Sequence, residues 1–204
     1  MTAAIQQGRG RQQGEAYVIT ESLDTRCTFR DDTHGIFQRS KDNLKRLGTL
    51  AVQIDSMKRK HVEACASIMG RLELFKKYKY TSAAARTMLE CALKDRHSKL
   101  VIATHHRTVV GFAWFVPRGA FDRSGYLRLL AVDAPFHGQG IGRRLMNFLE
   151  KRHLHSGGIV LLASSFNDDA QGFYERLGYR PVGELPNYVH KGFSERIYFK
   201  PPPG

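Results

Sequence analysis

The sequence has few cysteines and no long apolar run. Its three cysteines, Cys27, Cys65 and Cys91, stand far apart and include no C-x-x-C pair, a pattern that predicts neither a disulfide framework nor a zinc site. No apolar run approaches the roughly 18 residues of a membrane span, and no apolar signal core stands near the N-terminus. We therefore expect no metal, no membrane association and no secretory signal, and a protein that stays in a reducing cytoplasm.

Acidic residues are also scarce relative to basic ones. The chain has 32 Lys and Arg against 19 Asp and Glu, which gives a formal net charge of +13. Such a surplus raises the local concentration of anions and favours nucleic acid, nucleotides or phosphorylated cofactors as partners. No long block of like charges marks a nucleic-acid-binding arm, so the surplus fits a solvated cationic surface equally well.

The composition of the chain changes near residue 47. Residues 1–47 are rich in Gln, Gly, Arg, Asp and Thr and contain one short β-like run, 16–20. We expect them to form an N-terminal extension of unknown role. With 204 residues and a hydrophobic content of 42%, the chain is long enough for one core of about 150 residues. We therefore assign residues 48–204 to a single domain.

Apolar periodicity predicts alternating helices and strands after the extension. A strand is expected at 50–54, a helix at 57–80, and a second helix at 81–95 with Thr81 as its N-cap. The later expected strands are 100–103, 108–116, 126–132 and 159–163, with a final pair within 179–199; the later expected helices are 143–154 and 167–177. The polar turn 105–107 joins the first two of these strands as an antiparallel hairpin. The resulting order, β-α-α-β-β-β-α-β-α-β-β, indicates a mixed α/β protein.

A glycine-rich turn, Gly138-Gln-Gly-Ile-Gly142, lies between an expected strand and an expected helix. Glycines let a backbone approach an anion closely, and the free N–H groups of a helix's first turn attract that anion. The turn lacks the third glycine of the dinucleotide pattern G-x-G-x-x-G because residue 143 is Arg, and the chain contains no P-loop. Taken alone, the turn fits an anion site or a flexible connection before a helix.

Three segments in order resemble one protein superfamily. They read LLAVD at 129–133, HGQGIGRRL at 137–145 and NDDAQGFYERLGY at 167–179. Their order and spacing resemble the GCN5-related N-acetyltransferase (GNAT) superfamily, whose signature is [Q/R]-x-x-G-x-[G/A] after an L-A-V strand, followed by N-x-x-A-x-x-x-Y-x-x-x-G-[F/Y]. The resemblance covers about residues 50–200. One departure is His137, which stands where the family usually has Gln or Arg.

The resemblance implies an α/β fold with a mostly antiparallel sheet that is splayed between its fourth and fifth strands and flanked by helices. The fourth strand then carries a bulge, and the pantetheine arm of acetyl-CoA pairs with its edge. Backbone amides of 138–143 hold the pyrophosphate, so we expect cofactor binding to tolerate His137. The implied cofactor-binding residues are Leu130, Ala131, Val132, His137, Gly138, Gln139, Gly140, Ile141, Gly142, Arg143, Asn167 and Tyr174.

Two of these residues are the implied catalytic groups. By the resemblance, the Leu130 amide donates a hydrogen bond to the oxyanion. Tyr174 matches the family's tyrosine near the thioester sulfur, where its hydroxyl acts as a general acid. The alternative for Tyr174 is a buried ring that packs against the sheet. Asn167 either caps its helix or bonds the pantetheine arm, and the two uses are compatible.

The general base is missing from its usual place in the sequence. Family members often carry Glu or His on the strand before L-A-V, but the equivalent residues here are Tyr126 and Arg128. We assign both as acceptor-binding residues, because an arginine suits a carboxylate or phosphate on the acceptor. An arginine on a strand is otherwise a surface residue. The proton acceptor stays open among a water chain and the carboxylates of Asp122, Glu184 and Glu73.

The leading functional prediction is an acetyl-CoA-dependent N-acetyltransferase that acts on the primary amine of a small molecule. One alternative is acetylation of a macromolecular amine, namely a protein N-terminus or lysine, or aminoacyl-tRNA, since lysines gather at 76–79. Another is an acyl-CoA-binding sensor without catalysis, because no base is evident. The sequence leaves the oligomeric state open, with a homodimer as one option.

Overall fold

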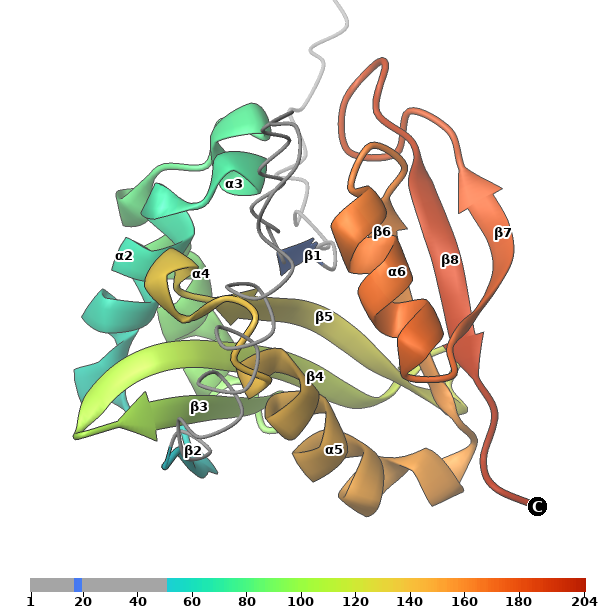
Figure 1. The fold of residues 1–204 in the computed structure, drawn as a ribbon. Coiled ribbons are helices and arrows are strands. Elements are labelled where there is room, and N and C mark those ends of the chain that lie inside the picture. Colours follow the sequence, from blue (N-terminus) through green and yellow to red (C-terminus); the bar gives the residue numbers. More distant parts are fainter. Residues whose placement is uncertain (1–16, 20–50) are drawn as a thin grey trace, which may run out of the picture.

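The computed structural model describes residues 17–19 and 51–204 (Figure 1). Within these residues the strands are β1 (Tyr17–Ile19), β2 (Gln53–Ser56), β3 (Lys99–His105), β4 (Thr108–Ala120), β5 (Ser124–Val132), β6 (Ile159–Ser164), β7 (Arg180–Leu185) and β8 (Glu195–Lys200). The α-helices are α2 (Val62–Arg71), α3 (Glu73–Lys77), α4 (Ser82–Lys94), α5 (Ile141–His153) and α6 (Asp168–Arg176). Three short 3-10 helices are η1 (Arg59–His61), η2 (Ala134–Phe136) and η3 (Leu154–Ser156).

The described strands form one eight-stranded sheet in the order β2-β3-β4-β5-β6-β8-β7, and β1 pairs with β5 outside this path. Neighbours along the path run antiparallel except β5 and β6, which are parallel. The expected mixed α/β fold with a mostly antiparallel sheet is therefore confirmed, and the structure shows that the fourth and fifth strands of the main path are parallel. The β-like run at 16–20 forms β1, whereas the rest of the extension, including Cys27, lies outside the described residues.

The expected hairpin at 100–116 is confirmed as β3 and β4. Its two-residue turn consists of His106 and Arg107, whose φ angles are 46° and 66°. Positive φ at both positions matches the right-handed twist of the two strands. Beyond the expected end, β4 continues to Ala120 before the chain returns as β5.

The continuous helix expected at 57–80 is wrong. The chain instead forms η1, α2 and α3, with an extended residue, Leu72 (φ −81°, ψ 130°), between α2 and α3. Leu72, Phe75 and Tyr78 are all buried in one core, and the break at Leu72 redirects the chain so that the latter two reach it. The apolar residues thus keep a helical spacing although the chain changes direction at Leu72. Periodicity alone does not reveal this change.

The second expected helix, 81–95, is confirmed as α4. The Thr81 side chain accepts a hydrogen bond from the Ala84 amide at 3.1 Å, which is the expected N-cap. The last helix is capped in the same way, because Asn167 Oδ1 accepts from the Ala170 amide at 3.1 Å.

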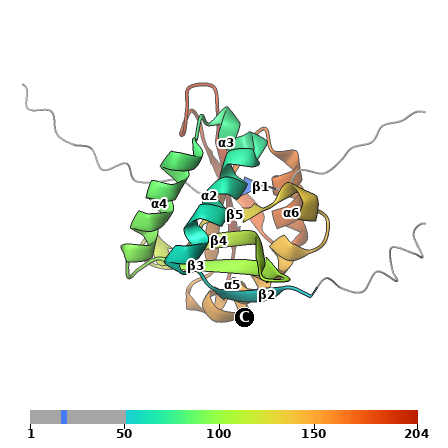
Figure 2. The same cartoon turned by 90° about the vertical axis from the view of Figure 1, so that its left-hand side faces the viewer.

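Helices cover both faces of the sheet (Figures 1 and 2). Helices α2–α4 pack on one face, where Met69, Leu89 and Leu129 belong to one core cluster. Helices α5 and α6 pack on the other, where Leu130 and Tyr174 belong to a second cluster. Among the described residues no helix combines the length and the apolar character that crossing a membrane requires.

Strands β5 and β6 separate partway along their length. They pair only where Gly125, Tyr126 and Leu127 lie beside Ile159, Val160 and Leu161. The register between β4 and β5 shifts at the same level, because Trp114 pairs with Leu129 while Phe115 pairs with Leu127. Arg128 is thus the extra residue of a β-bulge, which bends β5 away from β6. The expected bulge and splay are present, and the opening lies next to the glycine turn.

Candidate functional site

The turn from β5 into α5 leaves backbone amides accessible. Gly138 and Gly140 have φ angles of +72° and +75°, and a Cβ at either position would meet nothing within 4 Å. Gly140 is the N-cap of α5, and no side chain caps this helix. The first-turn amides of α5 therefore point toward open space with the positive end of the helix dipole behind them. Such a cradle fits a phosphate or diphosphate group.

A cavity of about 910 Å³ opens beside this turn. Its lining comes from the β5–α5 turn and from α6, and includes Val132, Phe136, Gly140, Arg143, Phe173 and Arg176. The volume lies within the range usual for ligand-binding sites. Two arginines and one acid, Asp169, line the cavity, so its side chains favour an anionic ligand. All residues expected to bind the pyrophosphate except Gln139 thus border one cavity.

Two side chains hydrogen-bond to backbone carbonyls and so hold the turn in shape. His137 Nε2 lies 2.7 Å from the Val132 carbonyl oxygen, and because a carbonyl only accepts, this nitrogen donates. Gln139 donates from Nε2 to the Pro135 carbonyl at 3.0 Å. His137 therefore braces the connection between β5 and the glycines. This contact explains how a histidine is compatible with a turn that binds through its backbone.

Tyr174 is fully buried beneath the opening. Its ring packs against Phe173, Tyr179 and Tyr198, and it belongs to the same core cluster as Leu130. No described residue is a hydrogen-bond partner of its hydroxyl oxygen. Burial raises the pKa of Tyr174 well above its usual value of 10.0, because desolvation disfavours the phenolate. The site thus contains a protonated hydroxyl that lacks a partner among the described residues and is suited to donate to a ligand.

The acceptor-binding candidates Tyr126 and Arg128 lie on β5 before the opening. Tyr126 is half-buried and pairs with Val116 on β4 and Val160 on β6. The Arg128 guanidinium stacks on the ring of Trp114 at 4.3 Å, and its Nε is buried with no hydrogen-bond partner among the described residues. Trp114 belongs to the cluster on the α2–α4 face, so Arg128 extends over that face and lies on the opposite side of the sheet from Tyr174.

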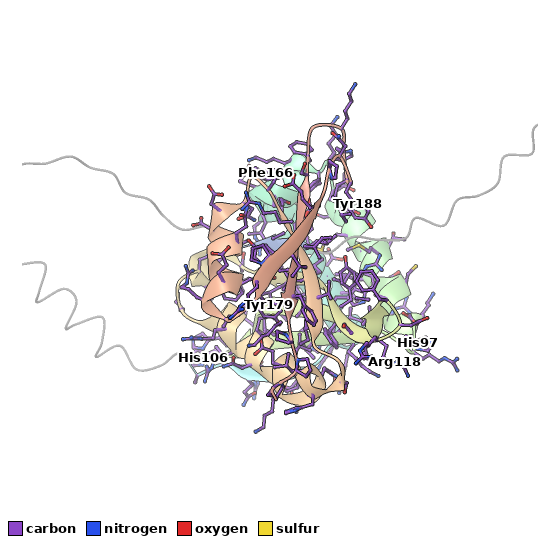
Figure 3. The ribbon with its side chains drawn as sticks, turned by 90° about the vertical axis from the view of Figure 1, so that its right-hand side faces the viewer. His97, His106, Arg118, Phe166, Tyr179 and Tyr188 are labelled. Carbon is purple, nitrogen blue, oxygen red and sulfur yellow. The ribbon has the colours of Figure 1, made fainter. Side chains whose placement is uncertain are left out.

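The three proposed carboxylate bases are all exposed. Asp122 lies in the turn before β5, Glu184 lies on the edge strand β7, and Glu73 pairs with Lys76 at the surface. Asp122 lies near the end of β5 that is paired with β6, away from the opening between these strands. His106 lies in the β3–β4 turn, and Figure 3 shows it well below Phe166, which follows β6.

A buried acid that sequence reasoning missed does lie at the opening. Glu195 begins β8, pairs with Ser164 at the end of β6 and is 1% exposed. Ser164 Oγ donates to its carboxylate at 3.0 Å, and the Tyr78 hydroxyl donates to the same carboxylate. The Tyr78 and Ser164 hydroxyls are also within hydrogen-bonding distance of each other. The only sequence signal was that Glu195 falls within the final pair of strands expected at 179–199.

An aromatic wall surrounds this acid on the α2–α4 face. The Tyr78 ring stacks on His190, with 6.0 Å between centroids, and contacts Phe166 and Phe193. Lys77 Nζ lies 4.6 Å from the Phe166 ring centroid. Figure 3 shows Phe166 near the β7–β8 loop that carries Tyr188. A cationic and aromatic surface therefore borders the opening on the face opposite Tyr174.

Comparison with known proteins agrees with this geometry. The sequence model of the Acetyltransferase (GNAT) family matches residues 66–179. This match spans more than half of the chain, and the chain belongs to that family. Enzymes of this family are acyltransferases, and the expected class of enzyme is therefore confirmed.

Individual relatives differ in the acceptors that their names state. N-acetylaspartate synthetase of Danio rerio is 29% identical over 144 residues, which cover 61% of this chain and 50% of that protein. N-alpha-acetyltransferase RimI of Mycobacterium tuberculosis is 33% identical over 98 residues, which cover 47% of this chain and 61% of RimI. The chain thus spans about half the length of the first of these relatives.

Solved structures share the fold at low sequence identity. An aminoglycoside 6'-N-acetyltransferase complexed with coenzyme A superposes with a TM-score of 0.60 at 22% identity, covering 74% of this chain and 99% of that one. The likeness establishes the overall fold. That solved structure contains coenzyme A.

Proposed function

We propose that this protein transfers an acetyl group from acetyl-CoA to the primary amine of a small molecule by direct attack on the thioester. The observation that carries the proposal is the junction of three features: the parted strands β5 and β6, the open glycine turn of α5, and the buried Tyr174 hydroxyl. When bound, the cosubstrate supplies an activated acyl carbonyl. This chain must bind it, polarise its carbonyl and move two protons.

Binding and polarisation are assigned to backbone groups. The amides of 138–143 bind the diphosphate, and Arg143 contributes positive charge beside them. The edge of β5 at Leu130, Ala131 and Val132 lies beyond the last β5–β6 pair, and this edge pairs with the amides of the pantetheine arm. The Leu130 amide donates to the carbonyl oxygen of the thioester as negative charge develops there.

The two proton transfers lie on opposite faces of the sheet. Tyr174 lies in the core cluster on the α5–α6 face, where its hydroxyl donates a proton to the departing sulfur. Tyr78 lies in the cluster on the α2–α4 face, beside Ser164 and Glu195. This separation suits direct attack, because the amine loses a proton and the thiolate gains one at two different atoms, and a different group can serve each of them.

We assign proton removal from the amine to the cluster of Tyr78, Ser164 and Glu195. With the bulge residue Arg128 left out of the count, Leu130 lies level with Ala163 beyond the last β5–β6 pair, Leu127 and Leu161. Ser164 directly follows Ala163, so it lies within one residue of the level of Leu130 across the opening. An alkylamine with a pKa of about 10.4 costs about 4–5 kcal/mol to deprotonate at neutral pH. The Ser164 or Tyr78 hydroxyl accepts the proton from the amine and passes its own proton to the Glu195 carboxylate.

A small acceptor is favoured by the surface around this cluster. The aromatic wall of Tyr78, Phe166, His190 and Phe193 is compact, and Lys77 adds positive charge at its edge. The name of the Danio relative indicates a product derived from aspartate, which is a small amine with carboxylates. Arg128 and Tyr126 stay candidates for contact with the acceptor on the same face.

Release of CoA by the purified protein with a broad panel of amines tests the proposal. Turnover on one or more small amines supports it, and acetyl-CoA binding without turnover on any acceptor would instead indicate a sensor. Salt dependence tests the macromolecular alternative. Turnover on aminoacyl-tRNA should fall steeply between low and physiological salt, because counterion release drives that binding. Turnover on a small neutral amine should change little over the same range.

A further inference from the structure

Strand β1 lies along the edge of β5 that the pantetheine arm is expected to use. Its three residues pair in parallel with β5, so that Tyr17 lies beside Leu129, Val18 beside Leu130 and Ile19 beside Ala131. Strand β1 also lies close to β6 and α6. Figure 1 shows it between β5 and β6, where those two strands have separated.

This position conflicts with cofactor binding. The edge of a strand has one row of N–H and C=O groups, and one extended partner uses that row at a time. The paired segment of β5, Leu129 to Ala131, includes the residue to which the oxyanion contact is assigned. A pantetheine arm and β1 therefore cannot occupy this segment together.

We propose that residues Tyr17–Ile19 are an intramolecular competitor of acyl-CoA, a strand that occupies the pantetheine position until the cofactor displaces it. The inference rests on the proposed function, because it assumes that acyl-CoA binds along β5. Strand β1 forms a short parallel pair of only three residues. A pair of this length is weak and therefore displaceable.

The geometry provides a route for the exchange. The cavity at the α5 turn is lined by residues from Val132 onward, beyond the last residue that β1 pairs with, Ala131. The diphosphate can therefore bind at the turn while β1 still lies on β5. The pantetheine arm then replaces β1 along the strand, and its tethered end makes the exchange intramolecular. Competition by β1 lowers the apparent affinity for acyl-CoA. The apparent affinity equals the intrinsic affinity multiplied by the fraction of molecules in which the edge of β5 is free.

A pair of proline substitutions in the full-length chain tests the competition. Neighbouring N–H groups of a strand point to opposite edges, so Val18→Pro with Ile19→Pro removes the donor directed at β5 whichever residue provides it. The matched control is Ala3→Pro with Ala4→Pro, which adds two prolines to the same extension outside β1. The dissociation constant of CoA is measured for both variants and the unchanged chain by titration calorimetry.

The double variant in β1 should bind CoA at least about threefold more tightly than the unchanged chain, which corresponds to β1 occupying the edge in two thirds of the molecules. The control should bind as the unchanged chain does. Equal or weaker binding by the β1 variant overturns the competition, and weaker binding means that β1 belongs to the cofactor site. If none of the three proteins binds CoA, the proposed function itself fails, a result distinct from equal binding by all three.

Hydrogen exchange of the unchanged chain gives a readout that does not depend on a variant. On addition of saturating CoA, amides in Tyr17–Ile19 should lose protection because the strand leaves the sheet, while amides at 138–143 should gain it. Retained or increased protection of Tyr17–Ile19 in the presence of bound CoA overturns the proposal.

Discussion

Ser164 on β6 donates a hydrogen bond to the carboxylate of Glu195 on β8, 3.0 Å away across the antiparallel pair. The pair lies at the end of β6 that has parted from β5, and Tyr78 reaches it from the α2–α4 face. This contact places a buried carboxylate where the sequence showed no base. It also makes the proposed proton transfer testable.

Glu195→Gln should lower kcat about 100-fold and leave the dissociation constant of CoA within about twofold, because the amide keeps the volume of the side chain but does not accept a proton. The exposed Glu184, on the neighbouring strand β7, supplies the control Glu184→Gln, which should keep full activity. Steady-state kinetics and calorimetry measure both effects.

An acceptor amine of low pKa separates a proton-accepting role from a structural one. Such an amine is already neutral at neutral pH, so Glu195→Gln should lose much less activity with it than with an alkylamine. An equal loss with both acceptors would show that Glu195 only supports the fold. Tyr78→Phe, which removes one hydroxyl from the cluster, provides a second variant if Glu195→Gln does not fold.

Tyr174→Phe should lower kcat about 100-fold while it weakens acetyl-CoA binding little, because the hydroxyl matters for protonation of the thiolate and the ring packing stays. Tyr179→Phe is the control, since Tyr179 is a neighbouring buried tyrosine, 5.5 Å from Tyr174 between ring centroids. It should keep kcat within a few-fold. An unchanged kcat in Tyr174→Phe removes this residue from the mechanism.

The pH profile gives a further check on Tyr174. Burial raises its pKa above the usual value of 10.0, and a raised pKa means that the hydroxyl stays protonated as the pH increases. Activity should therefore show no decline from loss of this proton up to about pH 10. A descending limb that starts below pH 9 and disappears in Tyr174→Phe contradicts the assignment.

Gly140→Asp should weaken CoA binding at least about 100-fold, because a negative charge enters the cradle at the start of α5. Gly140→Asn is the control, since Asn has nearly the same shape and tolerates the same φ of +75° without charge. Titration calorimetry with CoA should show a far smaller loss for Asn than for Asp. Normal binding by the Asp variant means that the diphosphate site lies elsewhere.

Gly125→Ala should destabilise the protein by about 1–3 kcal/mol, because an added Cβ would lie 2.2 Å from Cζ of the buried Phe115 ring. Gly125 pairs with Ile159 at the closed end of the β5–β6 segment, so the strain falls two residues before the last pair, Leu127 and Leu161. Adding Phe115→Leu should recover part of the lost stability, measured as the free energy of unfolding in urea. A Gly125→Ala variant as stable as the unchanged chain contradicts the close contact.

Much of the fold could be predicted because its signals are local. The turn at 105–107, the caps at Thr81 and Asn167, and the short apolar run of β6 each depend on neighbours in the chain. The helix expected at 57–80 failed because Leu72 takes an extended conformation to bury residues on both sides of it. That choice depends on the sheet and α4, which the local pattern does not contain.

The candidate site divides in the same way. The glycine turn and Tyr174 belong to segments that match the family signature, and in the structure both lie near the opening between β5 and β6. Glu195 has no such pattern. Its burial depends on Tyr78, which precedes it by more than a hundred residues, and on its register with Ser164.

By itself, the sequence determined the family, the glycine cradle and a tyrosine at the right spacing after it, because each is a property of contiguous residues. Only the tertiary structure decided which carboxylate lies at the opening, where Arg128 extends, and that a strand from the extension lies on the edge of β5 to which we assign the cofactor. These relations arise from strand register and from the packing of distant segments, which no local pattern of residues specifies.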